Sequence, residues 1–144
     1  MVAWEDVSRA FTGAARYWIA TTDADGSPHV HQHWGVFVDG RFFFEGGSKT
    51  RWARNVARVP RGVVTAERLG FAIMIEGSVR AMTPDPGLAE RLVKAFARKY
   101  ARSEGYTPSP TNWENSGLHA VTPSRAFAWR YKYFGKTATR FTFG

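Results

Sequence analysis

Short runs of β-branched and aromatic residues, separated by tight-turn signals, limit this chain of 144 residues to a sheet of neighbouring strands. The clearest signal is Asp39-Gly40, which lies between two apolar runs and is typical of a two-residue hairpin turn. A second turn signal, at 23–28, separates the first two runs. The first half is therefore expected to form three strands, paired in sequence as a meander: 16–22, 29–38 and 41–45.

The second half predicts further strands around one long helix. An apolar stripe at helical spacing, from Leu88 to Tyr100, indicates a helix that ends by Gly105. Shorter apolar patterns predict helices near the start of the chain and after the third strand, at 4–11 and 52–59. The remaining segments are expected to be strands at 63–67, 71–82, 118–133 and 139–143, and a loop at 106–117.

These elements favour a mainly β, α+β fold in which six to seven antiparallel strands form a barrel, flanked by one long and two short helices. At 144 residues, the chain has the size of one domain, so 1–144 are expected to form a single domain. The composition, 44% hydrophobic and 15% aromatic, excludes intrinsic disorder as the main state.

Several classes of protein and of chemistry are excluded by what the sequence lacks. No run approaches the ~20 apolar residues that span a bilayer, and no basic stretch followed by an apolar one begins the chain, so we expect a cytoplasmic protein without membrane contact. The absence of cysteine excludes disulfides, thiolate metal sites and cysteine nucleophiles, so redox chemistry must come from a bound cofactor. No hydrolase motif or carboxylate pair at acid/base spacing is present.

Positive charge is concentrated in the middle of the chain. The 20 Lys and Arg residues outnumber the 12 Asp and Glu residues, and 41–68 alone hold seven cations against two carboxylates. An anionic partner near this segment is one explanation. A solvated basic face that only keeps the protein soluble is the other.

The turn at 46–51, Gly-Gly-Ser-Lys-Thr-Arg, leads from a strand into the first helix of the basic segment. Amide groups at a helix start lack internal partners, and Lys49, Arg51 and the hydroxyls of Ser48 and Thr50 stand at the same end. These groups suit a phosphate, although glycine before a capping serine also starts many helices that bind nothing. A planar ring over the phenylalanines at 42–44 could place its phosphate here.

Three histidines, His29, His31 and His33, alternate with other residues, so on a strand their imidazoles share one face. The wall of a polar cofactor or substrate pocket is the first interpretation, and an exposed row of histidines is the second. A metal or haem site is the third, because ligands this close on one strand seldom converge on one ion, and His119 is distant in sequence.

Seven stretches occur in an order and spacing that together are more specific than any one alone: YWIATT (17–22), DGSPHV (25–30), WGV (34–36), DGRFFF (39–44), TRWARNV (50–56), IEGSV (75–79) and ATRF (138–141). In this respect the chain resembles, nearly end to end, the pyridoxamine 5'-phosphate oxidase-like family of flavin-binding split β-barrels. That family includes relatives that use the deazaflavin coenzyme F-420.

The resemblance implies a homodimer with two cofactor sites at its interface, with each ring against the second and third strands and each phosphate against the turn before the short helix. Trp52 stands where many relatives carry a phosphate-binding lysine, so Lys49 or Arg51 would have to replace that lysine. Thr50, Arg51 and Asn55 match the family's positions. The cofactor-binding residues implied are Gln32, His33, Trp34, Phe44, Glu45, Ser48, Lys49, Thr50, Arg51, Trp52 and Asn55.

The function implied is that of an oxidoreductase that uses FMN, or alternatively F-420, to move a hydride to or from a small organic substrate. The cofactor ring carries the hydride in such sites, so no catalytic residue is assigned, and His31 and His33 are the candidates for proton donation. One alternative is a non-catalytic barrel that binds a flavin or, against expectation, nucleic acid. Another is a haem or metal protein built on His29, His31 and His33.

Overall fold

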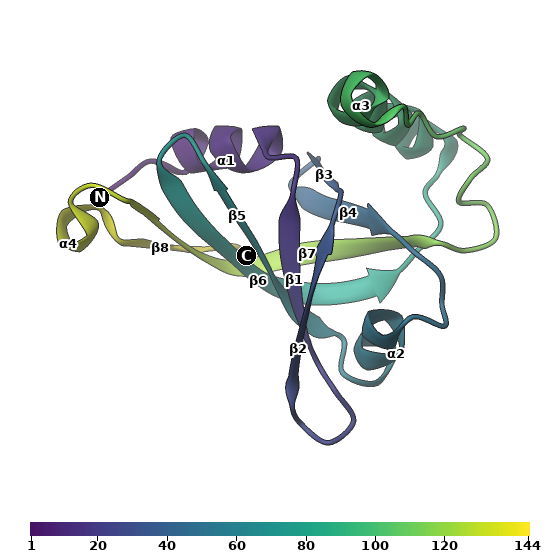
Figure 1. The fold of residues 1–144 in the computed structure, drawn as a ribbon, viewed down its shortest axis with the longest axis horizontal. Helices are drawn as coiled ribbons and strands as arrows, with labels where there is room; N and C mark the ends of the chain where they lie inside the picture. Colours follow the sequence, from purple (N-terminus) through teal and green to yellow (C-terminus); the bar gives the residue numbers. More distant parts are fainter.

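The computed structural model describes residues 1–144, which form one curled antiparallel sheet with four helices around it (Figure 1). The strands are β1 (Tyr17–Thr22), β2 (Pro28–His33), β3 (Val36–Val38), β4 (Arg41–Glu45), β5 (Arg61–Arg68), β6 (Phe71–Ala81), β7 (Leu118–Arg130) and β8 (Thr139–Thr142). The helices are α1 (Trp4–Gly13), α2 (Arg51–Arg58), α3 (Pro86–Glu104) and α4 (Phe134–Thr137). The predicted fold class is confirmed.

The order of the strands explains why the sheet curls. It runs β2-β1-β5-β6-β7-β4-β3, with β8 added to β7, so β2 and β3 are the edge strands at the two ends of this order. Only Trp34 and Gly35 separate these edge strands in sequence. Three Cα–Cα steps span at most about 11 Å, so both edges must come close together, and the sheet bends into a split barrel.

The single strand predicted at 29–38 is wrong, because it is divided into β2 and β3 at Gly35, which gives eight strands instead of six or seven. The Gly35 N–H donates to the Tyr100 hydroxyl (2.9 Å), and the Gly35 carbonyl accepts from Lys99 Nζ (2.7 Å), so both groups are withdrawn from strand pairing. A Cβ at Gly35 would lie 2.1 Å from the Phe42 ring. Only glycine therefore allows the chain to cross here.

The predicted meander is wrong for the same reason. Hairpins β1–β2 and β3–β4 form as expected, but β2 does not pair with β3. Instead β4 pairs with β7, which places Phe44 opposite His119.

The pairing of β6 with β7 is interrupted by a bulge at Glu76 and Gly77, where a Cβ on Gly77 would lie 2.1 Å from the Thr122 carbonyl oxygen.

The core has two parts, one on each side of the β3–β4 hairpin. In the larger part, Phe11 of α1 and Val56 of α2 are buried against the concave face of the sheet. The smaller part lies under α3, where Phe96 and Tyr100 pack with Trp113 of the loop at 106–117. Each large apolar side chain buried in this way contributes about 1.5–3 kcal/mol.

The predicted helices form, and two of them begin with a side-chain cap. Thr50 Oγ1 accepts from the Ala53 N–H at the start of α2, and the Asp85 carboxylate accepts from the Leu88 N–H at the start of α3. The sequence did not reveal α4, a single turn without buried side chains that ends the predicted strand 118–133 early. No helix has the length and apolar character needed to cross a bilayer.

Candidate functional site

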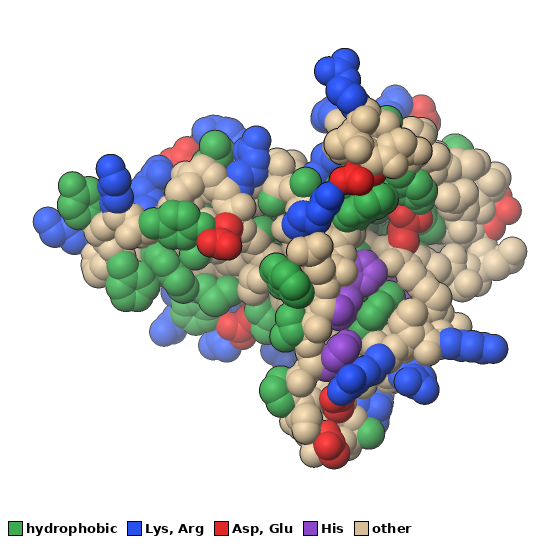
Figure 2. Space-filling model, viewed as in Figure 1, with side chains coloured by type: hydrophobic (Ala, Val, Ile, Leu, Met, Phe, Trp, Pro, Cys, Tyr) green, Lys and Arg blue, Asp and Glu red, His purple; other side chains and the backbone are tan.

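The histidine row lies on β2 and faces α2. His29, His31 and His33 are half-buried, whereas the residues between them are exposed, so the prediction of a shared face is confirmed. Figure 2 shows these imidazoles as a purple row on the surface between β2 and α2, which we call the β2–α2 face. Ring centroids are 5.6 Å apart for His29 and His31 and 4.6 Å apart for His31 and His33.

Trp52, from the first turn of α2, packs against this row. Its ring is nearly parallel to that of His31, with centroids 5.5 Å apart, and edge-on to that of His33 at 5.1 Å. Phe44 of β4 and His119 of β7 lie 4.9 and 4.8 Å from Trp52. These five side chains form what we call the imidazole–aromatic cluster: His31, His33, Phe44, Trp52 and His119.

The imidazoles of the cluster are uncharged at neutral pH. Burial lowers the pKa of His31 to about 4, with a contribution from its histidine neighbours on β2. Burial, with a contribution from His119, likewise lowers the pKa of His33 to about 4, and burial lowers the pKa of His119. Neutral imidazole has one donor nitrogen and one acceptor nitrogen, so the cluster offers both kinds of group.

Some of these nitrogens lack partners. Nδ1 and Nε2 of His31 and Nδ1 of His119 are buried and make no hydrogen bond. A buried polar atom left without a partner costs about 1–3 kcal/mol, so such atoms are uncommon in folded proteins. A ligand with polar ring edges would satisfy them.

The start of α2 also offers free donors. The N–H groups of Arg51 and Trp52 have no hydrogen-bond partner, and they lie at the positive end of the helix dipole. Ser48 and Lys49 are exposed in the preceding turn, where their side chains are likewise free of hydrogen bonds. This arrangement can bind an anion.

The Arg51 guanidinium, in contrast, is already engaged. It contacts both oxygens of the Asp23 carboxylate, with Nε 2.9 Å from Oδ1. Asn55 Nδ2 donates to the same carboxylate (2.9 Å) and to Thr21 Oγ1 (3.0 Å). Hydrogen bonds from Arg51 and Asn55 hold the pKa of Asp23 well below its usual range. These contacts fasten α2 to the β1–β2 hairpin.

An open cleft of about 510 Å³ lies beside the contacts of Arg51 and Asn55 with Asp23, at the lower end of the β2–α2 face in Figure 2. Three arginines and two aspartates contribute to it, so its net charge is positive. Arg58 is held in place by the Thr22 carbonyl oxygen (2.7 Å) and by Asn55 Oδ1 (3.1 Å). The lining residues are Asp23, Ala24, Asp25, Arg51, Arg54, Asn55 and Arg58.

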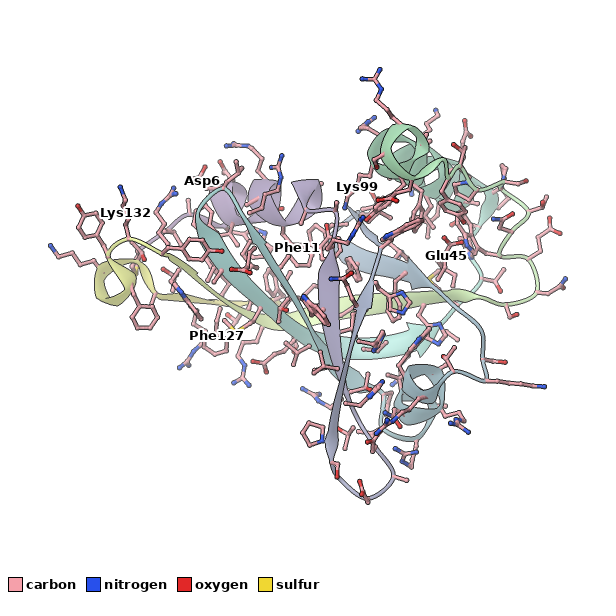
Figure 3. The ribbon with its side chains drawn as sticks, in the orientation of Figure 1. Asp6, Phe11, Glu45, Lys99, Phe127 and Lys132 are labelled. Atoms are coloured by element: carbon pink, nitrogen blue, oxygen red, sulfur yellow. The ribbon has the colours of Figure 1, made fainter.

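Glu45 marks the other end of the β2–α2 face (Figure 3). Its carboxylate accepts hydrogen bonds from the Tyr106 hydroxyl (2.8 Å) and from Trp113 Nε1 (2.7 Å), both in the loop at 106–117. The loop therefore fixes a carboxylate beside the histidine row. A cleft of about 280 Å³ here is lined by Gln32, His33, Trp34 and Glu45.

The eleven residues that sequence analysis proposed for cofactor binding fall in three places on the β2–α2 face. The cluster contains His33, Phe44 and Trp52, and the small cleft contains Gln32, Trp34 and Glu45. The turn before α2 and the helix itself hold Ser48, Lys49, Thr50, Arg51 and Asn55. Sequence reasoning missed His119, Asp23, Tyr106 and Trp113. Of these, only Asp23 gave a local signal, as a carboxylate in the turn before the histidine row.

The geometry of the histidine row does not favour the metal part of the third interpretation. No three histidine or carboxylate side chains are arranged to hold a metal ion. His31 is stacked between His29 and Trp52, with interplanar angles of 19° and 14°. His29 and His31 thus meet through their faces, whereas His31 and His33 meet edge to face at 82°.

Comparison with protein families identifies the fold family. The model described as pyridoxamine 5'-phosphate oxidase matches residues 4–130, most of the chain. The chain belongs to the pyridoxamine 5'-phosphate oxidase family. The resemblance noted in the sequence is thereby confirmed. No curated protein sequence matches the chain.

Several solved structures share the fold of this chain at low sequence identity. A conserved hypothetical protein from Mycobacterium tuberculosis has a TM-score of 0.73 and 19% identity, over 94% of this chain and 89% of that one. A pyridoxamine 5'-phosphate oxidase-related, FMN binding protein from Nostoc punctiforme has a TM-score of 0.66 and 11% identity, over 100% and 98%. A heme binding protein from Mycobacterium smegmatis has a TM-score of 0.73 and 15% identity, over 99% and 58%.

Proposed function

We propose that this protein is an oxidoreductase that holds FMN, or alternatively F-420, on the β2–α2 face and transfers a hydride to or from a small organic molecule. The observation that carries the proposal is the set of unpartnered imidazole nitrogens among aromatic rings, beside a helix start with free amides. Membership of the family and the fold of the FMN binding neighbour support it. When bound, the flavin ring supplies the hydride chemistry.

A phosphate fits the start of α2. The amides of Arg51 and Trp52 and the Ser48 hydroxyl can donate to its oxygens. Trp52 supplies no cation and only 6% of it is exposed, while Arg51 is bound to Asp23. We therefore propose that Lys49 neutralises the charge of the phosphate, because it is the cation of this turn that has no carboxylate partner.

We assign the flavin ring to the imidazole–aromatic cluster. Its edge carries several donors and acceptors, which His31 and His119 can meet with nitrogens that have no partner within the protein. His33 belongs both to the cluster and to the cleft lined by Glu45, so it lies between the ring and the place for a small substrate. We assign proton transfer to His33, because its uncharged imidazole can both donate and accept.

The large cleft bears on the choice of cofactor. F-420 carries an acidic tail in addition to its phosphate, and the arginines at 51, 54 and 58 offer it positive charge. However, Asp23 and Asp25 line the same cleft, and Asp23 already neutralises Arg51. We therefore place FMN first and F-420 second.

The outer face of the sheet supports the proposal of a homodimer. Trp18 and Val30 are 49% and 54% exposed there, although both are apolar. Trp18 lies in one row across the sheet with Thr65, Met74 and Phe127, so apolar side chains from three of these four strands share this face. A second copy of this chain would cover it.

Haem binding is the second candidate function. One unpartnered imidazole of the cluster, such as that of His31, can serve as an axial ligand even though three histidines do not converge. The fold shared with the heme binding protein from Mycobacterium smegmatis favours this candidate.

Titration of the purified protein with FMN, riboflavin, F-420 and haem tests the proposal. We expect FMN to bind with a Kd of about 10 µM or below, about −7 kcal/mol, and at least about tenfold tighter than riboflavin. Lys49→Ala should reduce this preference for the phosphate, whereas the control Lys132→Ala, in an exposed turn, should not. His33→Ala should slow turnover more than it weakens cofactor binding.

Failure to bind either cofactor would overturn the proposal. If neither FMN nor F-420 binds below about 100 µM, the protein is not a flavin enzyme. A Soret band on addition of haem, lost in His31→Ala, would then establish the second candidate instead.

A further inference from the structure

A further groove lies outside the β2–α2 face, between the end of α1, the edge strand β3 and α3. It has a volume of about 450 Å³, within the range of sites for small ligands. It shares no residue with the β2–α2 face. Its lining residues are Thr12, Gly13, Val36, Phe37, Val38, Arg91, Lys94, Ala95, Arg98 and Lys99.

One side of this groove is apolar. Val36, Phe37 and Val38 of the edge strand β3 form it, and Ala95 faces them from α3. Phe37 and Val38 are only half-buried, so part of their apolar surface is left in contact with water. Covering this surface with an apolar ligand would be favourable.

The other side of the groove is positively charged, and no carboxylate lines it. Arg91 pairs with Asp39, and Lys94 pairs with Glu90, but Arg98 and Lys99 form no ion pair. The Arg68 guanidinium adds further charge, because it occupies the space that a side chain at Gly13 would need.

Lys99 is the innermost of these cations (Figure 3). Its ammonium donates to the Tyr17 hydroxyl (2.7 Å) and to the Gly35 carbonyl oxygen (2.7 Å), which are both uncharged acceptors. Burial, with a contribution from the charge of Arg68, lowers the pKa of Lys99 to about 7. A half-buried cation without a counter-ion is well placed to bind an anion.

We propose that this groove binds a free medium-chain fatty acid, with its carboxylate at Arg98 and Lys99 and its alkyl chain along Phe37 and Ala95. An apolar wall beside unpaired cations matches a ligand with one anionic end and an apolar body. Neither a purely polar anion nor a neutral hydrocarbon uses both sides of the groove. The groove and the β2–α2 face have no residue in common, so this site does not depend on cofactor binding.

Calorimetric titration of the whole protein with dodecanoate tests the proposal. We expect saturable binding in the micromolar range, with dodecyltrimethylammonium, the matched cation, at least tenfold weaker. Arg98→Gln and Lys99→Met should each weaken dodecanoate binding at least fivefold. Ala95→Phe should abolish binding by filling the groove while all cations stay in place. Arg102→Gln, which removes a charge from α3 outside the groove, is the control and should bind like the wild type.

Proton uptake gives an independent measurement. A bound carboxylate raises the pKa of Lys99, so binding at about pH 7.5 should take up a fraction of a proton, seen as a dependence of the heat on the buffer. The other titratable and charged groups that face Lys99 are Tyr17, Tyr100 and Arg68, and the hydroxyls stay protonated at this pH because burial raises the pKa of both tyrosines.

The proposal is overturned if dodecanoate does not bind, or binds no better than its cationic counterpart. It is also overturned if the affinity of a folded Arg98→Gln variant matches that of Arg102→Gln. If the protein binds anionic lipid vesicles but not monomeric dodecanoate, the positive charge of the groove serves contact with a membrane surface and the proposal is overturned. Because Lys99 supports Gly35, thermal melts must first show that Lys99→Met is folded.

Discussion

Trp52 determines the character of the β2–α2 face at the level of single residues. Its indole contacts His31, His33, His119 and Phe44 and is only 6% exposed, so it excludes water from the rings around it. This burial is the main reason why the pKa values of the histidines are low. Trp52 therefore builds a neutral imidazole cluster beside the start of α2.

The pH dependence of stability tests this view. His31 and His33 have a pKa of about 4 in the folded chain, against about 6.5 for an unperturbed histidine, so the unfolded chain binds protons first as the pH falls. The contribution of these histidines to the free energy of unfolding should therefore be complete above about pH 6.5 and decrease from there towards pH 4. Urea unfolding across this range would measure the decrease.

The control for that experiment is the double variant His31→Gln and His33→Gln, which removes both titrating groups. Its free energy of unfolding should depend less on pH than that of the wild type over the same range. Parallel pH profiles for the two proteins would contradict the low pKa values.

The limits of sequence reasoning are also clearest at single residues. The alternation of histidines on β2 was enough to predict that they share a face, because side chains on a strand alternate. His119 could not be assigned to the same cluster, since it enters only through the pairing of β4 with β7. Arg51 was proposed for phosphate, but its contact with Asp23 depends on the packing of α2 against the β1–β2 hairpin.

At the level of elements, periodicity and turn signals located most helices and strands, but two glycines determine how the strands pair. Gly35 divides one predicted strand into β2 and β3, and Gly77 allows the bulge between β6 and β7. Both make close approaches to atoms of distant segments, Phe42 and Thr122. Such approaches have no signature in the neighbouring sequence, and the one at Gly35 is why the predicted meander was wrong.

Alanine substitution at Gly77 should be destabilising, because its Cβ would lie 2.1 Å from the Thr122 carbonyl oxygen and the backbone has to shift. We expect a loss of about 1–3 kcal/mol in the free energy of unfolding. Gly87→Ala is the control: it lies in α3 with its nearest neighbour at 3.4 Å, and should be neutral or stabilising by about 0.5 kcal/mol. Equal melting temperatures for the two variants would contradict this account of the bulge.

At the scale of the whole molecule, the core packs on the concave face of the sheet and leaves apolar side chains exposed on the outer face. Trp18, Met74 and Trp129 line a shallow cleft on it, and Trp18 is 49% exposed. A lone apolar residue on a surface is ordinary, but several apolar side chains on one face of a sheet indicate a partner. This is the basis of the homodimer proposed above.

Replacing Trp18 with glutamate should dissociate that dimer, because each copy would bury an unpaired charge in the interface. Light scattering should give about twice the mass of one chain for the wild type and the mass of one chain for Trp18→Glu. Arg102→Glu, at an exposed residue in the last turn of α3, is the control and should remain dimeric. A monomeric wild type would refute the proposal.

The pairing of β4 with β7 has a consequence for synthesis in the cell. The β3–β4 hairpin leaves the ribosome early, but its only neighbour in the sheet, β7, begins at Leu118. Until that segment emerges, β4 has one open edge and its phenylalanines lack their native cover. The nascent chain must therefore stay incompletely folded through most of translation, and chaperones that shield apolar segments should matter more for this protein than for a meander of the same size.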